Sequence, residues 1–255
     1  MDGKKSHNRI ELTLEEIYHE KLMRCVLENI QNTSLVLKGG TGLYMCYGLN
    51  RFSEDLDFDS DKRVEIHRDI EKSIPSDIIL DTINLKKDTE MAKRYLIHYL
   101  IKEKPQEKHF LKIDISYKTP PFQNEIKVIN NIKVVSIACM INNKLHTAFD
   151  GPHTRTKARD LFDLHFLAKN YTEHFTPDFA KRLMEFSKDL DQVYNTYYPH
   201  VREDTILNKI MDLETIVLEL NTIATALHNK YSQIFPTQQT PQHKEPPTPS
   251  KGRRR

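Results

Sequence analysis

Aspartates at alternate positions follow a pair of glycines in the first quarter of the chain. Residues 55–59 read DLDFD, and the pair is Gly39–Gly40. A period of two is typical of a strand with one apolar face and one acidic face. The apolar run Ser34–Lys38 before the glycines predicts another strand, and residues 41–48 after them predict a short helix that ends at Gly48. The sequence thus predicts a strand, a glycine turn, a helix and an acid-bearing strand, in that order.

Carboxylates two residues apart on a strand point to the same side, roughly 6.6 Å apart along the chain. Asp55 and Asp57 would repel each other there unless a cation lay between them, and ligation by oxygen alone favours magnesium or manganese over zinc. A third acid comes from FLKIDISYK, residues 110–118, where alternation puts Asp114 on the polar face. We therefore predict that Asp55, Asp57 and Asp114 bind metal. The alternative for an acidic strand on its own is a solvated edge.

The glycine pair adds a second kind of binding site. Gly39 and Gly40 stand between a strand and the start of a helix, where backbone N–H groups and the helix dipole can hold a phosphate. A glycine pair alone is most often a tight turn. The two signals together favour a ligand that carries both phosphates and metal ions, and a nucleoside triphosphate is the commonest such ligand.

Length and composition allow one large or two small globular domains, because 38% of the 255 residues are hydrophobic and 29% are charged. No apolar run approaches the roughly 18 residues of a membrane helix, and the first residues lack the apolar region of a signal peptide, so we expect a cytoplasmic protein with no membrane partner. The three cysteines are far apart without a CxxC pattern, and the twelve histidines show no ligand spacing. These patterns argue against a disulfide framework and a structural zinc site.

The net charge of +2 is concentrated at the C-terminal end. Residues 236–255 hold five basic residues and one acid, a charge of +4, which leaves 2 − 4 = −2 for the rest. A body so close to neutral gives no overall electrostatic reason to bind nucleic acid, although a local basic groove stays open. Because residues 236–255 are rich in Pro, Gln and Thr and contain almost nothing to bury, we predict a disordered basic tail.

The remaining pattern predicts an α+β fold, with a mixed sheet and flanking helices followed by a helical domain. Thr13 and Glu16 form a capping box at the start of a first helix. Further strands are predicted at residues 78–83, 95–101, 110–117, 125–129 and 132–137, with Asn130–Asn131 as a hairpin turn between the last two. Helices are predicted at residues 138–149, 157–169, 177–189 and 203–231. This organisation divides the chain into an α/β core at residues 1–136, a helical domain at residues 137–235 and the tail.

Two stretches of this sequence resemble the motifs of a known family. KGGTGLYMCYGLNRFSEDLDF, residues 38–58, resembles the GGT(A/S)L…R-x-S-x-DLDF signature of the AbiEii-type nucleotidyltransferases, the toxin components of type IV toxin–antitoxin and abortive-infection systems. NKLHTAFDGPHTRTKARDLFDLHFL, residues 143–167, is similar to the distal motif of this family, a lysine followed by R-x-K-x-RD-x-x-DL. The resemblance covers roughly residues 15–170. One departure is Gly42, which stands where the family has a small residue with a side chain.

The resemblance implies a polymerase β-like nucleotidyltransferase core and assigns roles to residues of both motifs. Asp55 and Asp57 would bind both metal ions, Mg²⁺ or Mn²⁺, and Asp114 would complete the site. The triphosphate would be held by the start of the helix and by the loop after it, at Gly39, Gly40, Thr41 and Ser53. In the distal motif, Lys144 would be the fixed cation, Asp160 would belong to the active site and Lys157 would contact the nucleotide.

Residues of the distal motif also have structural alternatives. Lys144 could be a helix lysine that extends its ammonium group to solvent. Asp160 and Asp163 share a helix face, and Arg159 with Asp163 is an i,i+4 pair that would contribute about 0.3 kcal/mol.

Residues near the first motif carry further expectations. Arg51 either caps the strand or touches phosphate. Asp59 lies outside the DLD core of the family and is predicted to be a surface residue. Glu54 is predicted to point away from Asp55 and to lie outside the metal site.

The predicted reaction is transfer of a nucleoside monophosphate from an NTP to an RNA (tRNA-like) or protein acceptor, with release of pyrophosphate. A cognate antitoxin is an expected partner. An RNA acceptor would need a positive path, which Lys144, Arg155, Lys157 and Arg159 could line. One alternative is a non-catalytic nucleotide-binding or scaffold protein, against which the intact trio of aspartates argues. Another is a small-molecule nucleotidyltransferase of the aminoglycoside type, which would need an acidic antibiotic pocket.

Overall fold

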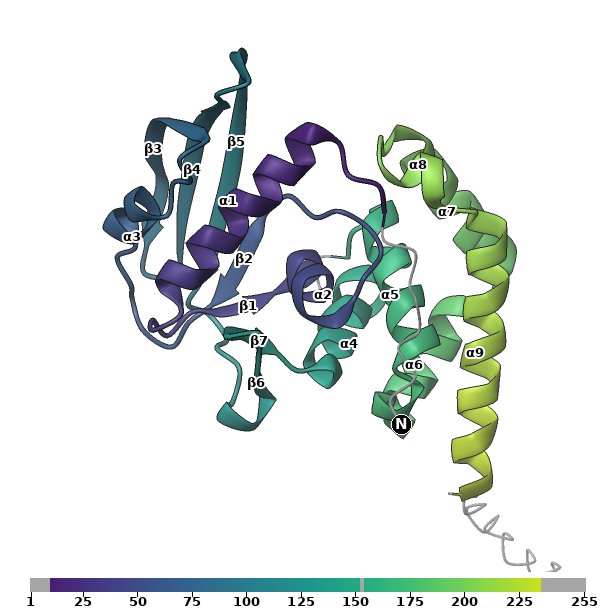
Figure 1. The fold of residues 1–255 in the computed structure, drawn as a ribbon. Coiled ribbons are helices and arrows are strands. Elements are labelled where there is room, and N and C mark those ends of the chain that lie inside the picture. The colour runs from purple at the N-terminus through teal and green to yellow at the C-terminus, as the bar shows by residue number, and fades with distance from the viewer. Residues whose placement is uncertain (1–9, 152–153, 235–255) are drawn as a thin grey trace, which may run out of the picture.

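The computed structural model describes residues 10–151 and 154–234, and it contains a seven-stranded sheet beside a group of helices (Figure 1). The strands are β1 (Val36–Lys38), β2 (Leu56–Asp59), β3 (Ile78–Thr89), β4 (Ala92–Ile101), β5 (Lys104–Ser116), β6 (Ile126–Ile129) and β7 (Ile132–Val135). The helices are α1 (Leu14–Ile30), α2 (Gly39–Tyr47), α3 (His67–Lys72), α4 (Ile137–Leu145), α5 (Ala158–Asn170), α6 (Pro177–Ser187), α7 (Leu190–Glu203), α8 (Leu207–Ile210) and α9 (Leu213–Ile234). Short helical turns are η1 (Gln123–Glu125), η2 (His146–Asp150) and η3 (Thr172–His174).

The sheet is mixed, which confirms the predicted fold class. Its strand order is β3-β4-β5-β2-β1-β7-β6. Strand β2 runs parallel to β5, and β1 runs parallel to β7, whereas the other neighbours are antiparallel. The strands of the first motif, β1 and β2, therefore lie inside the sheet as an antiparallel pair. Strand β5 flanks this pair on one side and β7 on the other.

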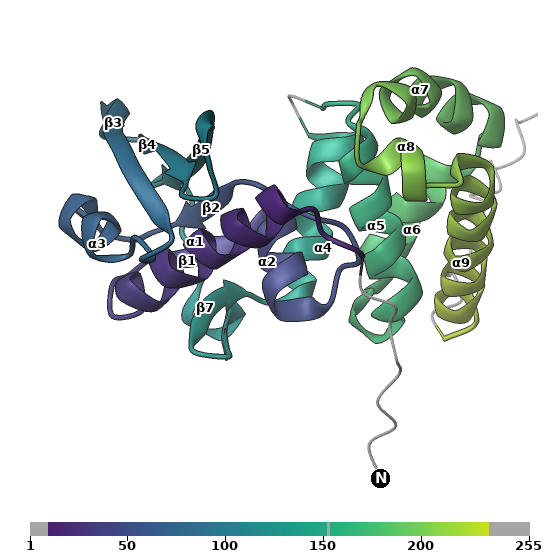
Figure 2. The same ribbon diagram turned by 45° about the horizontal axis from the view of Figure 1, so that its top comes forward.

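Helix α1 covers one face of this sheet (Figures 1 and 2). The helix begins at the predicted capping box, in which Thr13 and Glu16 bond each other's backbone. The covered face is built from alternate residues of β4 and β5, all 1% exposed or less: Tyr95, Ile97, Tyr99, Leu111, Ile113 and Ile115. Each such buried side chain stabilises the fold by roughly 1.5–3 kcal/mol, so this face anchors the core of the α/β half.

The opposite face carries charged side chains in register across four strands. In the backbone register, Lys38 on β1 lies opposite Asp57 on β2, and Asp57 lies opposite Asp114 on β5. Asp114 in turn lies opposite Arg94 on β4. Neighbours in such a row lie about 5 Å apart, and side chains of one row point to the same side. The backbone pairing thus brings the two predicted metal ligands Asp57 and Asp114 next to each other.

Strands β3, β4 and β5 are longer than predicted. The added strand residues are 84–89, 92–94 and 104–109, where charged residues interrupt the apolar alternation. Helix α3 was not predicted. The hairpin between β6 and β7 is confirmed, since Asn130 and Asn131 have φ values of 50° and 65°, as a two-residue turn with a left-handed backbone requires.

The helical half follows the predictions up to α6 and then departs from them. The predicted helix at residues 203–231 is wrong, because α7, α8 and α9 replace it. Asp204 Oδ1 accepts hydrogen bonds from the backbone N–H groups of Ile206 (3.0 Å) and Leu207 (2.9 Å), and Asp212 Oδ1 accepts one from Thr215 (3.3 Å). These aspartates satisfy the first N–H groups of new helices, so the apolar stripe continues while the backbone turns twice. Figure 2 shows α7, α8 and α9 at the outer side of the helical half.

The remaining organisational predictions have different standings. The sheet ends at Val135 and α4 begins at Ile137, close to the predicted boundary at Ser136, although the domain division stays a prediction. The predicted disordered tail lies outside the described residues. Among the helices of residues 10–151 and 154–234, none has the length and apolarity needed to cross a membrane.

Candidate active site

The acid cluster, defined here as Asp55, Asp57 and Asp114, lies on the charged face of the sheet. Asp55 Oδ2 is 2.5 Å from Lys112 Nζ, which also lies 3.8 Å from Asp114 Oδ2. Asp114 accepts two hydrogen bonds from Arg94, at 2.5 and 3.0 Å. Two of the three carboxylates are therefore paired with cations from the neighbouring strands.

Asp57 differs from the other two acids. It is half-buried, yet within the described residues its carboxylate accepts no hydrogen bond and forms no ion pair. Burial raises the pKa of Asp57, and the charges of Asp55 and Asp114 raise it further, against a smaller opposing effect of Lys112 and Lys38. Asp57 is thus an acid whose negative charge the chain does not compensate.

The donor set fits a divalent cation, although the side chains are not gathered around one. Three carboxylates offer oxygen ligands alone, which suits Mg²⁺ or Mn²⁺, and the uncompensated Asp57 is where a cation would relieve repulsion. As the side chains stand, no group of three or more His, Cys, Asp or Glu residues in the described ranges is arranged to hold a metal ion.

The start of α2 lies beside Asp57. Gly39 has a φ of +71°, and a Cβ atom there would stand 3.3 Å from Asp57 Oδ2. The N-cap residue Lys38 makes no side-chain cap hydrogen bond, so no side chain caps the N–H groups of the first turn. The N-terminus of α2 is therefore available to an anion directly next to the acid cluster.

Gly40, Thr41 and Ser53 form a tight contact behind this helix start. A Cβ atom on Gly40 would stand 2.5 Å from Arg51 Nη2 and 3.0 Å from Ser53 Oγ, so Gly40 is required by the approach of two side chains. The Thr41 hydroxyl lies 2.9 Å from Ser53 Oγ and donates to the carbonyl oxygen of Asp55. This bond fixes the backbone that carries Asp55 against α2.

Four residues of the distal motif form a charge network with Arg51, called here the distal network. Its members are Arg51, Lys144, Arg155, Asp160 and Asp163, and all but Arg155 are buried. Arg51 donates two hydrogen bonds of 2.7 Å to Asp163. Lys144 Nζ lies 2.7 Å from Asp160 and 2.5 Å from Asp163, and Arg155 Nε donates to Asp160 at 2.7 Å. Three cations against two acids leave a charge of 3 − 2 = +1.

The charges of this distal network stabilise one another. Burial alone would raise the pKa of Asp160 and Asp163, but the adjacent cations hold both pKa values below the usual range. Arg51 also lies against Gly40, so one cation of this positively charged network stands at the start of α2. A polyanion at that helix start would meet a favourable potential.

The structure places the other predicted residues as follows. Lys144 is 8% exposed and is engaged by two carboxylates, so it does not extend to solvent. Asp160 and Asp163 share a helix face, as predicted, and both contact Lys144. Lys157 is the exposed N-cap residue of α5.

Two expectations are wrong, and the one for Arg51 is only partly tested. Asp59 lies on β2 between β1 and β5, is 5% exposed and forms an ion pair of 2.5 Å with Lys38, so it is no surface residue. Arg51 donates two hydrogen bonds to Asp163, through Nε and Nη2, and one to the carbonyl oxygen of Phe52, through Nη1; its contact with phosphate stays a prediction. The i,i+4 pair of Arg159 with Asp163 does not form, because Asp163 points to Arg51.

Arg159 instead joins two other segments. It binds Asp204 at 2.8 Å and Glu54 at 3.1 Å. The Glu54 carboxylate is therefore turned toward the helical half, in line with its predicted place outside the metal site.

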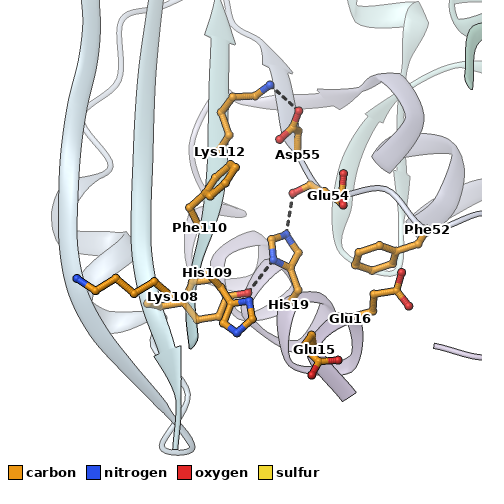
Figure 3. Close-up of a pocket in the computed structure, with 11 residues that line it drawn as sticks. Glu15, Glu16, His19, Phe52, Glu54, Asp55, Lys108, His109, Phe110 and Lys112 are labelled. Carbon is orange, nitrogen blue, oxygen red and sulfur yellow. Dashed lines mark hydrogen bonds and ion pairs between the residues drawn. The ribbon is translucent and has the colours of Figure 1, made fainter. Parts of the chain in front are cut away.

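A pocket of about 460 Å³ opens beside Asp55, between α1, β5 and the loop before β2 (Figure 3). Its acids are Glu15, Glu16, Glu54 and Asp55. Each is already engaged, by Lys104, the backbone of Thr13, Arg159 and Lys112 respectively. The pocket is thus not the uncompensated acidic surface that an aminoglycoside site would need.

The cations that bind the acid cluster could not be identified from the motifs. Lys112 and Arg94 hold the acid cluster but belong to no motif, and Arg94 reaches Asp114 only through the β4–β5 register. Alternation on β5 does place Lys112 on the face of Asp114, which was the available signal.

Comparison with known proteins shows which family this chain belongs to. The model of the AbiEii nucleotidyl transferase toxin family, type IV toxin–antitoxin system, matches residues 21–233. The crystal structure of JHP933 from Helicobacter pylori is 48% identical, with a TM-score of 0.85 over 88% of this chain and 96% of that one. A second H. pylori structure gives the same identity and TM-score and is covered over 99% of its length.

MenT4, the nucleotidyltransferase toxin Rv2826c from Mycobacterium tuberculosis H37Rv, is more distant. Its sequence is 15% identical to this one, and the TM-score is 0.48 over 87% of this chain and 88% of that one. The comparison with curated proteins found no match. The family model and the H. pylori structures span both motifs and both halves of the chain, and so the protein belongs to the AbiEii nucleotidyltransferase toxin family of type IV toxin–antitoxin systems.

Proposed function

We propose that this protein transfers a nucleoside monophosphate from an NTP to an acceptor hydroxyl, with release of pyrophosphate, and that it needs Mg²⁺ or Mn²⁺. The observation that carries the proposal is that a helix start suited to phosphate lies next to an acid suited to a metal ion. The uncapped N-terminus of α2 adjoins Asp57, an acid that nothing in the described chain neutralises. An anion site and a cation site side by side match an NTP with its metal ion.

The chain's own residues can divide the work. The N–H groups of the first turn of α2 would bind phosphate oxygens, with Ser53 beside them. The distal network, with its charge of +1, would stabilise the negative charge that builds up on the departing pyrophosphate. Asp55, Asp57 and Asp114 would hold the metal, which when bound stabilises charge on the phosphates and lowers the pKa of an attacking hydroxyl.

The acceptor is proposed to be RNA rather than protein. The charged face of the sheet continues along β4 and β5 past the acid cluster, with His98 opposite the 57% exposed Phe110 and with Lys108 and Lys112 beside them. An exposed aromatic ring among lysines suits a single strand, because bases stack on the ring while the cations follow the backbone. A cognate antitoxin would then restrain the activity.

The test is incubation of the purified protein with Mg²⁺, each of the four α-labelled NTPs in turn, and a mixture of total RNA and protein. Asp57→Asn and a sample with EDTA serve as controls. Label on RNA with the wild type alone supports the proposal, and label on protein alone would replace RNA as the acceptor. No label, while an NTP still binds, would favour a non-catalytic nucleotide-binding protein.

A growth assay checks the toxin role in cells. Expression of the wild type is expected to slow growth, and Asp57→Asn at equal abundance is expected not to. Equal growth of the two strains would contradict the role.

A further inference from the structure

The strongest unassigned feature of the site is the position of Lys112. Its Nζ lies 2.5 Å from Asp55 Oδ2 and 3.8 Å from Asp114 Oδ2, so one ammonium group contacts two members of the acid cluster. In Figure 3 the Lys112 side chain runs from β5 toward Asp55, and a dashed line marks their ion pair. Arg94, by contrast, contacts Asp114 from the outer side, and Lys38 pairs with Asp59.

We propose that Lys112 is the resident cation of the acid cluster, and that a divalent metal ion must displace it from Asp55. This inference rests on the proposed metal site and concerns a residue outside both family motifs. Three carboxylates with Lys112 and Arg94 give a charge of −3 + 2 = −1. Without Lys112 the charge would be −2, and three acids would repel one another with less to hold them in place.

Competition follows from the electrostatics of the pair. An ammonium group and a divalent cation that share the same carboxylate repel each other, because both are positive and lie only a few ångströms apart. Lys112 therefore has to leave Asp55 when the metal ion enters. The adjoining pocket of about 460 Å³, which Lys112 itself lines, gives the released side chain room.

The two functions of Lys112 have opposite consequences for metal affinity and for metal-free stability. As a placeholder, Lys112 keeps Asp55 oriented and lowers the repulsion in the cluster while metal is absent. As a competitor, it weakens metal binding. Its removal should therefore tighten metal binding and lower the melting temperature of the metal-free protein.

Mn²⁺ binding to the full chain, measured by EPR and by calorimetry without nucleotide or acceptor, tests the inference. Lys112→Met is expected to bind Mn²⁺ roughly tenfold more tightly than the wild type, the change that about 1.4 kcal/mol makes in a binding constant. Lys112→Arg keeps the charge and is expected to stay near the wild type. Lys108→Met is the matched control, because Lys108 lies on the same face of β5 but pairs with Asp81 at 3.3 Å. Its Mn²⁺ affinity should be unchanged.

Thermal unfolding supplies a second measurement. In EDTA, Lys112→Met should melt below the wild type, and saturating Mn²⁺ should raise its melting temperature by more than it raises that of the wild type. Equal Mn²⁺ affinity of Lys112→Met and the wild type would overturn the inference and leave the metal site standing. Mn²⁺ binding that survives Asp57→Asn in both backgrounds would instead overturn the metal site of the proposed function, and this inference with it.

Discussion

Among single residues, Asp57 carries a charge that opposes folding. Its pKa is raised by burial and by the adjacent charges of Asp55 and Asp114, and no hydrogen bond or ion pair in the described chain offsets this. A raised pKa of a carboxyl group means that the folded state resists ionisation more than the unfolded state does. The contribution of Asp57 to the stability of the protein therefore falls as the pH rises above the unfolded pKa of about 3.9.

Replacement of Asp57 by Asn should remove activity and add stability. Nucleotidyl transfer is expected to fall by more than about 100-fold, beyond the 10–100-fold typical of residues that only support metal ligands. At pH 8 in EDTA the variant should melt a few degrees, about 2–4 °C, above the wild type, and this difference should vanish near pH 4. Melting curves at the two pH values check the sign, and an Asn variant that is less stable at pH 8 would contradict the account.

His19 makes a second pH-dependent contribution, away from the acid cluster. Its Nε2 lies 2.7 Å from the carbonyl oxygen of Glu54 and must donate to it, while Nδ1 lies 2.8 Å from the Tyr99 hydroxyl. Burial lowers the pKa of His19, against smaller opposing effects of Glu54 and Asp55. Protonation therefore costs more in the folded state than in the unfolded one.

The contribution of His19 to stability should be full above the unfolded pKa of about 6.5 and should decline as the pH falls below it. The melting temperature of the wild type is expected to drop more between pH 7.5 and pH 5.5 than that of His19→Gln. Parallel pH profiles of the two proteins would exclude this role.

Among the elements, α2 gives the sharpest internal comparison, because two of its glycines face different neighbours. A Cβ atom on Gly40 would stand 2.5 Å from Arg51 Nη2, which Asp163 holds in place, whereas one on Gly42 would stand 2.7 Å from the flexible end of Met140. Gly40→Ala is expected to destabilise the protein by about 1–3 kcal/mol through overpacking. Gly42→Ala should be neutral or gain up to about 1 kcal/mol, as Gly to Ala in a helix does. Urea unfolding of both variants measures the difference, and equal effects would refute it.

Elements with a clear apolar period could be predicted from the sequence. The alternation at residues 55–59 and the box at Thr13 are local signals, and β2 and α1 follow them. The extended ends of β3, β4 and β5 could not be predicted, because charged residues there are held by cross-strand pairing rather than by their own pattern. The breaks at Asp204 and Asp212 were missed because an aspartate within an apolar stripe reads as a solvated helix residue until its bonds to the backbone are known.

The same distinction applies to the candidate site. The three acids could be found from alternation, and Lys144 with Asp160 from the resemblance. Their partners could not, since Arg94 meets Asp114 through register and Arg51 meets Asp163 across 112 positions of sequence. Long-range pairing of this kind leaves no local pattern.

For the whole molecule, the pair of Arg51 and Asp163 joins the sheet half to the helical half. Arg51 is 3% exposed and Asp163 is fully buried, and two hydrogen bonds of 2.7 Å connect them. Asp163→Asn would leave Arg51 and Lys144 without this carboxylate, and loss of one partner of a buried ion pair costs about 3–5 kcal/mol. Asp178→Asn is a matched control, because Asp178 is exposed and its pair with Arg182 at 3.6 Å contributes about 1 kcal/mol or less. Urea unfolding compares them, and a small loss for Asp163→Asn would show that the halves hold together without the pair.

The distal network also has a consequence for the time at which the protein becomes active. Arg51 leaves the ribosome long before Lys144, Asp160 and Asp163, which complete the network from α4 and α5. Until those helices have been synthesised and have docked, Arg51 beside Gly40 lacks the carboxylate that fixes it, and the start of α2 is unfinished. The start of α2 therefore reaches its final arrangement only after the chain has been synthesised as far as α5 and that helix has docked.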